Sequence, residues 1–112
     1  MYYIGIDISK FKHDCAVIDD SGEIVTPSWS FTNDAEGFSQ LKLLLNSLDT
    51  ETRIGLESTG HYGMNLKLFL ESNNFSFMEF NPLLINRFVK SKSLRKTKSD
   101  SIDCMMIAHY LM

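Results

Sequence analysis

Acidic residues at four positions have types and spacing that suit chemistry on phosphate esters. Asp100 and Asp103 lie three residues apart just before an apolar run, a separation that places two side chains on one face of a helix. Asp7 lies inside an alternating apolar segment, and Glu57 ends another short apolar segment. Carboxylates brought together repel one another, and a hard divalent cation such as Mg²⁺ or Mn²⁺ relieves that repulsion. Two such ions, about 3.5–4 Å apart, stabilise the attacking and leaving oxygens of a phosphodiester.

Each of these acids also has an ordinary structural interpretation. Asp7 can be a hydrogen-bonded residue near a strand end, and Glu57 can be an exposed acid at a helix entrance. Asp100 and Asp103 can interact with the helix dipole, which is worth a few tenths to about 1 kcal/mol. Gly5 shares a strand face with Asp7, so it either leaves room for a substrate or metal or allows close packing of a helix.

Positive charge is concentrated directly before the Asp100–Asp103 pair. Of the 11 Lys and Arg residues, six fall between positions 87 and 98, although the net charge is −3. This asymmetry favours a polyanion that binds at one place. We predict that the residues nearest the acidic pair contact nucleic-acid phosphates, and a solvated loop is the alternative. These residues are Lys92, Arg95, Lys96 and Lys98.

Length and composition limit the class of protein. The 112 residues are enough for one compact domain. No apolar run approaches the roughly 20 residues of a membrane span, and the first residues do not resemble a signal peptide. Only Cys15 and Cys104 carry thiols, and their positions predict buried free thiols in a reducing cytoplasm rather than a disulfide or metal site.

The first third of the chain predicts an antiparallel meander. Residues 2–8, 13–19 and 23–31 have strand patterns, and residues 19–22 form a turn signal. Pro27 cannot donate to a strand ladder, so its strand is expected at a sheet edge. A helix over 34–47 follows, and Asn33 with Glu36 predicts a capping box at its start.

The remaining chain alternates strands and helices. Strands are predicted over 52–57 and 75–80, with a helix around Tyr62 to Leu70 between them. Another helix begins at Pro82, and a last one is expected to run from near Ser99 to Met112. His61 is expected to be a surface or capping residue.

This order of elements indicates the α/β class. Strands that follow helices join strand 2–8 in parallel through right-handed crossovers. The result is a mixed five-stranded sheet with helices on both faces, which is the layout of the ribonuclease H-like fold. Strands 2–8 and 52–57 are then neighbours, so Asp7, Glu57 and the acidic pair can converge.

Four stretches of the sequence occur in the order typical of a known family: GIDISK at 5–10, ESTGHY at 57–62, NPLLINRF at 81–88 and RKTKSDSIDCMMIA at 95–108. With these motifs, the chain resembles the N-terminal domain of the DEDD transposases of bacterial insertion sequences. That family includes a pilin-gene inversion recombinase. Its N-terminal domain is similar to the Holliday-junction resolvase RuvC.

The resemblance implies a catalytic, metal-binding tetrad of Asp7, Glu57, Asp100 and Asp103. It also implies binding of two Mg²⁺ or Mn²⁺ ions and cleavage or exchange of DNA strands in the bacterial cytoplasm. Members of the family have a second, C-terminal domain with a catalytic serine, so residues 1–112 are expected to be the RuvC-like part of a truncated protein. The expected partners are DNA, a structured guide RNA encoded by the element, and further copies of the full-length chain in a dimer or tetramer.

Two alternatives remain open from the sequence. One is a non-catalytic nucleic-acid-binding or assembly module of the same fold, in which the acids are structural. The other is an actin-like phosphotransferase such as a sugar kinase, because Gly5-Ile6-Asp7 and a following hairpin fit its first phosphate loop. That loop normally continues with Gly and Thr, whereas no glycine follows here before Gly22.

Overall fold

A computed structural model describes residues 1–57, 60–91 and 103–112. Its centre is a five-stranded sheet with the order β3-β2-β1-β4-β5. The strands are β1 (Tyr2–Ile8), β2 (Lys12–Asp19), β3 (Ile24–Thr32), β4 (Thr52–Glu57) and β5 (Phe77–Phe80). The expected mixed sheet is confirmed, because β1 runs antiparallel to β2 and parallel to β4, and β4 runs parallel to β5.

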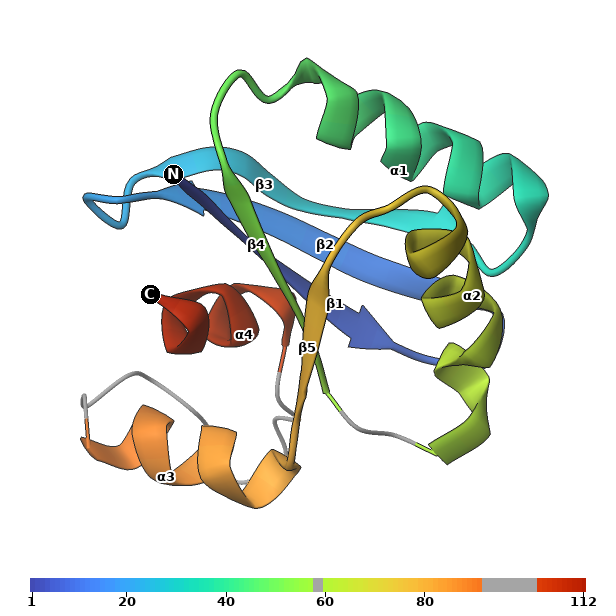
Figure 1. Ribbon diagram of the computed structural model, residues 1–112. Helices are drawn as coiled ribbons and strands as arrows, with labels where there is room; N and C mark the ends of the chain where they lie inside the picture. The colour runs from blue at the N-terminus through green and yellow to red at the C-terminus, as the bar shows by residue number, and fades with distance from the viewer. Residues whose placement is uncertain (58–59, 92–102) are drawn as a thin grey trace.

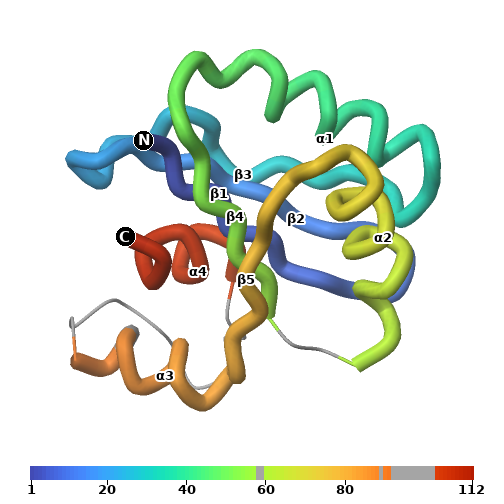
Figure 2. Tube along the Cα trace, in the orientation of Figure 1, coloured from blue at the N-terminus to red at the C-terminus, as the bar shows by residue number. Residues whose placement is uncertain are grey.

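Helices cover both faces of this sheet (Figure 1). Helix α1 (Ala35–Ser47), the short 3₁₀ helix η1 (Gly60–Gly63) and α2 (Met64–Ser72) lie on one side. Helices α3 (Pro82–Ser91) and α4 (Cys104–Leu111) lie on the other. The same two-sided arrangement is clear in the chain trace of Figure 2. This α/β architecture is the one expected and is consistent with a ribonuclease H-like layout.

Alternation along β1 divides the apolar core between the two faces. Ile4, Ile6 and Ile8 are buried in the larger cluster, together with apolar residues of α1 and α2. The opposite face of β1 presents Tyr3, Gly5 and Asp7, and Tyr3 packs with Ala108 and Leu111 of α4. The same strand therefore anchors the core on one face and presents Asp7 on the face that α4 covers.

Gly5 allows α4 to approach β1 very closely. A Cβ atom at this position would lie 2.0 Å from the carbonyl oxygen of Cys104 and 2.5 Å from the backbone nitrogen of Ala108. Close packing of a helix, one of the two interpretations of Gly5, is therefore confirmed. The other interpretation is wrong, since backbone atoms of α4 fill the space that a substrate or metal would need at Gly5.

The boundaries of two helices differ from those predicted. Asp34, not Asn33, is the N-cap of α1, and its carboxylate accepts a hydrogen bond of 3.0 Å from the backbone N–H of Gly37. Both residue types cap helices well, so the sequence did not distinguish them. The last helix begins at Cys104 rather than near Ser99, because Asp103 has an extended backbone with φ −106° and ψ 172°.

Other expectations about single residues are confirmed. Pro27 lies in β3, which is an edge strand. Cys15 and Cys104 are buried free thiols. Within the described ranges, no helix has the length and apolar character to cross a membrane.

Candidate functional site

Asp7 is the centre of an acidic region on the α4 side of the sheet. Its side chain is half-buried near the end of β1. Burial, together with the negative charges of Glu57, Asp14 and Asp103, raises the pKa of this carboxyl group to about 7. Since Coulomb interactions decline with distance, these contributions place the four carboxyl groups in one neighbourhood.

Glu57 reaches this region because β4 is the parallel neighbour of β1. Ile6 is paired with Leu56, so the next residues along the two strands, Asp7 and Glu57, follow at the same end of the sheet. Both therefore lie at the carboxyl ends of neighbouring parallel strands, where ligands of α/β proteins commonly bind. The predicted convergence of these two acids is observed.

Asp103 joins the region from the start of α4. Its carboxylate accepts a hydrogen bond of 2.9 Å from the backbone N–H of Met106, which caps the helix. The expectation that Asp103 lies inside the last helix is wrong, because Asp103 is the N-cap and precedes the first helical residue. Its structural role at the helix terminus is real and coexists with its position near Asp7. Asp100 lies outside the described residues.

We predict that Asp103→Asn leaves the free energy of unfolding nearly unchanged, whereas Asp103→Ala lowers it by about 1 kcal/mol. Asparagine retains an oxygen that can accept the hydrogen bond from Met106, and alanine does not. Urea denaturation of both variants in the absence of metal would measure the difference. Equal stability of the alanine variant would show that the cap contributes nothing.

Asp14 belongs to the same region but was missed by the sequence analysis. It is paired with Asp7 across the antiparallel β1–β2 ladder, and directly paired residues point to the same face of a sheet. Its carboxylate accepts a hydrogen bond from the hydroxyl of Ser30 in β3. The signal was present in the hairpin, because the pairing of strands 2–8 and 13–19 determines which residue lies opposite Asp7.

The thiol of Cys104 is affected by the same negative charges. Burial raises its pKa, a hydrogen bond of 3.3 Å with the hydroxyl of Ser28 opposes that effect, and Asp103, Asp14 and Asp7 raise it further. Because a protonated thiol is a poor ligand and nucleophile, Cys104 functions here as a small buried packing residue. This agrees with the interpretation from the sequence.

The carboxylates are the right type of ligand for a divalent metal, but the described side chains are not arranged as a ready metal site. Carboxylate oxygens are the ligands that Mg²⁺ and Mn²⁺ prefer, and the repulsion at Asp7 is what a cation would relieve. However, no three His, Cys, Asp or Glu side chains in ranges 1–57, 60–91 and 103–112 are arranged to hold a metal ion.

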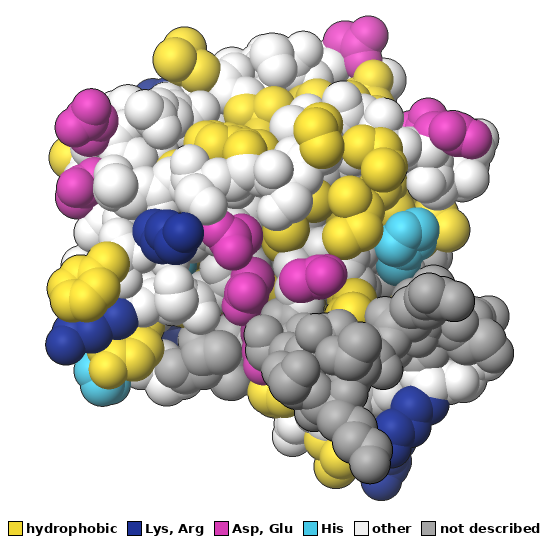
Figure 3. All heavy atoms as spheres, turned by 180° about the vertical axis from the view of Figure 1, so that it is seen from behind, with side chains coloured by type: hydrophobic (Ala, Val, Ile, Leu, Met, Phe, Trp, Pro, Cys, Tyr) yellow, Lys and Arg dark blue, Asp and Glu magenta, His cyan; other side chains and the backbone are white. Residues whose placement is uncertain are grey.

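The predicted basic contacts, Lys92, Arg95, Lys96 and Lys98, lie outside the described residues. Arg87 and Lys90, which precede them, are exposed on α3. Figure 3 shows acidic side chains grouped near the middle of one face of the molecule.

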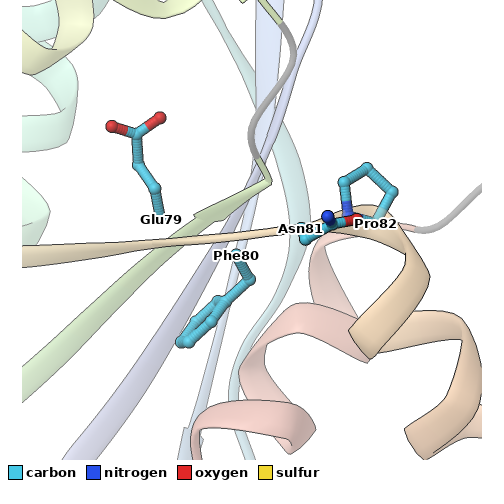
Figure 4. Close-up of a pocket in the computed structure, with 4 residues that line it drawn as sticks. All are labelled: Glu79, Phe80, Asn81 and Pro82. Carbon is cyan, nitrogen blue, oxygen red and sulfur yellow. The ribbon is translucent and has the colours of Figure 1, made fainter.

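A surface pocket lies where β5 leads into α3, beside the end of β4, because Phe80 is paired with Glu57. It is lined by Glu79, Phe80, Asn81 and Pro82. Figure 4 shows Glu79 and Phe80 pointing to opposite sides of β5. The carboxylate of Glu79 forms an ion pair of 3.3 Å with Lys67, and the side chain of Asn81 accepts a hydrogen bond from the N–H of Leu83. These polar groups are engaged in local structure.

The fold and the acidic region define an α/β domain whose carboxylates gather at the ends of central strands. Comparisons identify the family. The model of the IS110-type DEDD transposases, described as Transposase, matches residues 4–112. The chain belongs to this transposase family, which confirms the resemblance found in the sequence and removes support for a sugar kinase.

Named relatives agree with this assignment. The chain is 33% identical over 111 residues to a pilin gene-inverting protein of Moraxella lacunata, covering 96% of this chain and 33% of that protein. It is 34% identical over 112 residues to the pilin gene-inverting protein of Moraxella bovis, with coverage of 96% and 33%. A mini-circle putative transposase for IS117 from Streptomyces coelicolor is 27% identical over 113 residues, with coverage of 97% and 26%. The chain thus spans about a third of the length of the first two relatives and about a quarter of the third.

Proposed function

We propose that this chain is the metal-dependent, RuvC-like part of a transposase or recombinase that cleaves or exchanges DNA strands. The observation that supports the proposal best is the convergence of Asp7, Glu57 and Asp103, since burial and the charges of the neighbouring acids together raise the pKa of Asp7 to about 7. A repulsive arrangement of this kind reduces folding stability and is common at functional sites. Membership of the transposase family points to DNA as the substrate.

The metal ligands in this proposal are Asp7, Glu57 and Asp103, with Asp100 as the fourth. A pair of bound Mg²⁺ or Mn²⁺ ions would supply Lewis-acid stabilisation of the attacking and leaving oxygens. The chain's own contribution is positional. Strands β1 and β4 hold Asp7 and Glu57 side by side, and α4, packed against Gly5, holds Asp103 over the same strand end.

The partners are proposed from the resemblance and from charge. Lys92, Arg95, Lys96 and Lys98 would contact the phosphates of DNA or of a structured guide RNA. The full-length protein would act as a dimer or tetramer, since recombination joins two DNA ends. A further domain bearing a serine nucleophile would complete the reaction, and the greater length of the relatives is compatible with this.

We predict that millimolar Mg²⁺ or Mn²⁺ raises the melting temperature of the chain by roughly 4–8 °C, equivalent to about 1 kcal/mol. A ligand that binds only the folded state stabilises it, so Asp7→Asn should abolish the increase. Differential scanning fluorimetry with and without a chelator would measure it. Glu71→Gln is a matched control, because Glu71 is an exposed acid on α2 and should leave the increase intact.

The same experiment addresses the alternative of a non-catalytic nucleic-acid-binding or assembly module. That alternative is favoured by the absence of a ready metal-binding group among the described residues. An equal metal response in wild type and Asp7→Asn would remove Asp7 from the site, and no response in either protein would favour the module.

A further inference from the structure

The tip of the β1–β2 hairpin exposes an aromatic side chain between two lysines. Phe11 is 76% exposed, and Lys10 and Lys12 on either side of it are exposed as well. The Nζ atom of Lys10 lies 5.1 Å from the centre of the Phe11 ring, within the range of a cation–π interaction. Single exposed apolar residues are common, so this feature alone does not define a binding surface.

A second exposed aromatic residue lies in η1. Tyr62 is 38% exposed, and the neighbouring His61 is exposed too. Their ring centres are 4.5 Å apart. The hairpin tip and η1 therefore each present an aromatic ring to solvent. The side chain of Lys10 lies beside Phe11, and the imidazole ring of His61 lies beside Tyr62.

Asn33 joins these two segments. Its backbone N–H donates to the carbonyl oxygen of Phe11 at 2.9 Å. Its side-chain amide donates to the carbonyl oxygens of Lys10 at 3.1 Å and of Tyr62 at 3.3 Å. One residue thus fixes the backbone on which Phe11 and Tyr62 are mounted. This explains why Asn33 precedes the N-cap of α1 instead of serving as the cap.

Hydrogen bonds of His13 and Ser9 also order the turn at the hairpin tip. His13 is fully buried, and its Nδ1 atom accepts a hydrogen bond of 3.3 Å from the backbone N–H of Ser9. The hydroxyl of Ser9 donates to the carbonyl oxygen of Lys12. The exposed Phe11 therefore stands on an ordered turn, and an ordered aromatic ring loses little conformational entropy when it binds a ligand.

This surface lies at the same end of the sheet as the acids. The hairpin tip continues β1 directly beyond Asp7, and η1 begins shortly after Glu57. In Figure 3, Lys or Arg, hydrophobic and His side chains gather at the lower left edge of the face that shows the acidic group. A molecule bound at this edge would extend toward the carboxylates.

The chemistry of the surface matches an unpaired nucleic-acid strand. Bases stack on aromatic rings whatever their sequence, and lysines bind the phosphates between them. In a duplex the base faces already stack on one another, so they are not available to Phe11 or Tyr62. Because the chain carries a net charge of −3, cations beside the acids also reduce the repulsion of an approaching polyanion.

We propose that Phe11 and Tyr62, with Lys10 and Lys12, form a stacking surface for unpaired nucleotides of DNA or RNA next to the acidic site. The proposal rests on the proposed function, because it names what binds beside the same carboxylates. It concerns binding and needs no metal.

The test is the affinity of the chain for a short fluorescent single strand, measured by anisotropy in a chelator. We expect Phe11→Ala to weaken binding roughly tenfold. Phe11→Trp should preserve binding, and its fluorescence should be quenched when a base stacks on it. Leu43→Ala is the matched control, because Leu43 is 73% exposed on α1 and should leave affinity unchanged.

Parallel measurements with single-stranded DNA, single-stranded RNA and duplex DNA identify the ligand. If Phe11→Ala loses affinity only for single-stranded DNA or only for single-stranded RNA, the surface binds that nucleic acid. If it loses affinity for both, the surface binds unpaired nucleotides of either kind. Unchanged affinity of Phe11→Ala for every strand, or no binding by the wild type, would overturn the proposal and favour a protein partner. These binding measurements are made in a chelator. Their outcomes therefore do not depend on whether metal raises the melting temperature through Asp7.

Discussion

Replacing Asp7 by Asn is expected to raise the free energy of unfolding at pH 8 by roughly 1–2 kcal/mol when no divalent metal is present. The carboxylate of Asp7 is half-buried beside Glu57, Asp14 and Asp103, and its pKa is raised to about 7. Asparagine keeps the shape of the side chain and removes the charge. The expected gain is smaller than the full pKa shift implies, because water screens the exposed part of the carboxyl group.

The pH dependence of this effect has a definite sign. The pKa of Asp7 is higher in the folded state than its ordinary value of 3.8, so the folded protein binds a proton that the unfolded chain has lost. The contribution to stability is complete below about pH 4 and is lost as the pH rises through about 7. The advantage of Asp7→Asn should therefore increase across this window and level off above it.

Chemical denaturation of both proteins between pH 4 and pH 8, in a chelator, would measure this difference. His13, whose pKa is lowered by burial, changes stability in the opposite direction, but it is present in both proteins and cancels. If the difference in free energy of unfolding between the two proteins stayed constant from pH 4 to pH 8, the pKa of Asp7 would not be raised by folding.

Gly5→Ala should be among the most damaging single substitutions, with a loss of roughly 3 kcal/mol or more. The added methyl group would lie 2.0 Å from the backbone oxygen of Cys104 and 2.5 Å from the backbone nitrogen of Ala108. Neither backbone atom can rotate away, so the whole of α4 must shift. Because Asp103 is the N-cap of α4, the shift would also displace that carboxylate from Asp7.

Gly55→Ala is the matched control for this prediction. Its methyl group would meet side-chain atoms of Leu111 at 2.9 Å, and a side chain can adopt another rotamer at lower cost. Urea unfolding should rank wild type, Gly55→Ala and Gly5→Ala in decreasing order of stability. Equal losses for the two alanine variants would show that α4 adapts more easily than its contact with β1 indicates.

Much of the fold was predictable because the apolar periods are long and regular. The alternation in Tyr2–Ile8 and the order of strands and helices were sufficient for the mixed sheet and for the meeting of Asp7 with Glu57. The details that the sequence missed or left open depend on how the elements pair and pack. Asp14 lies opposite Asp7 because of strand register, and Gly5 meets α4 across nearly the whole length of the chain.

Helix boundaries were less predictable for a different reason. Asn33 and Asp34 are adjacent residues that both favour the cap position, and only the hydrogen bonds of Asn33 to Phe11, Lys10 and Tyr62 distinguish them. Asp103 combines two roles, as the cap of α4 and as a member of the acidic region. A sequence motif can single out Asp103, but it does not distinguish its role as a helix cap from its role in the acidic region.

The packing of α4 on β1 also has a consequence for the order of events during synthesis. During synthesis, Asp7 is made roughly a hundred residues before the helix that starts after Asp103 and covers Gly5. Contacts between residues so far apart in sequence form late in folding. A nascent chain that lacks α4 therefore has no complete acidic region, and partial translation products cannot assemble this site.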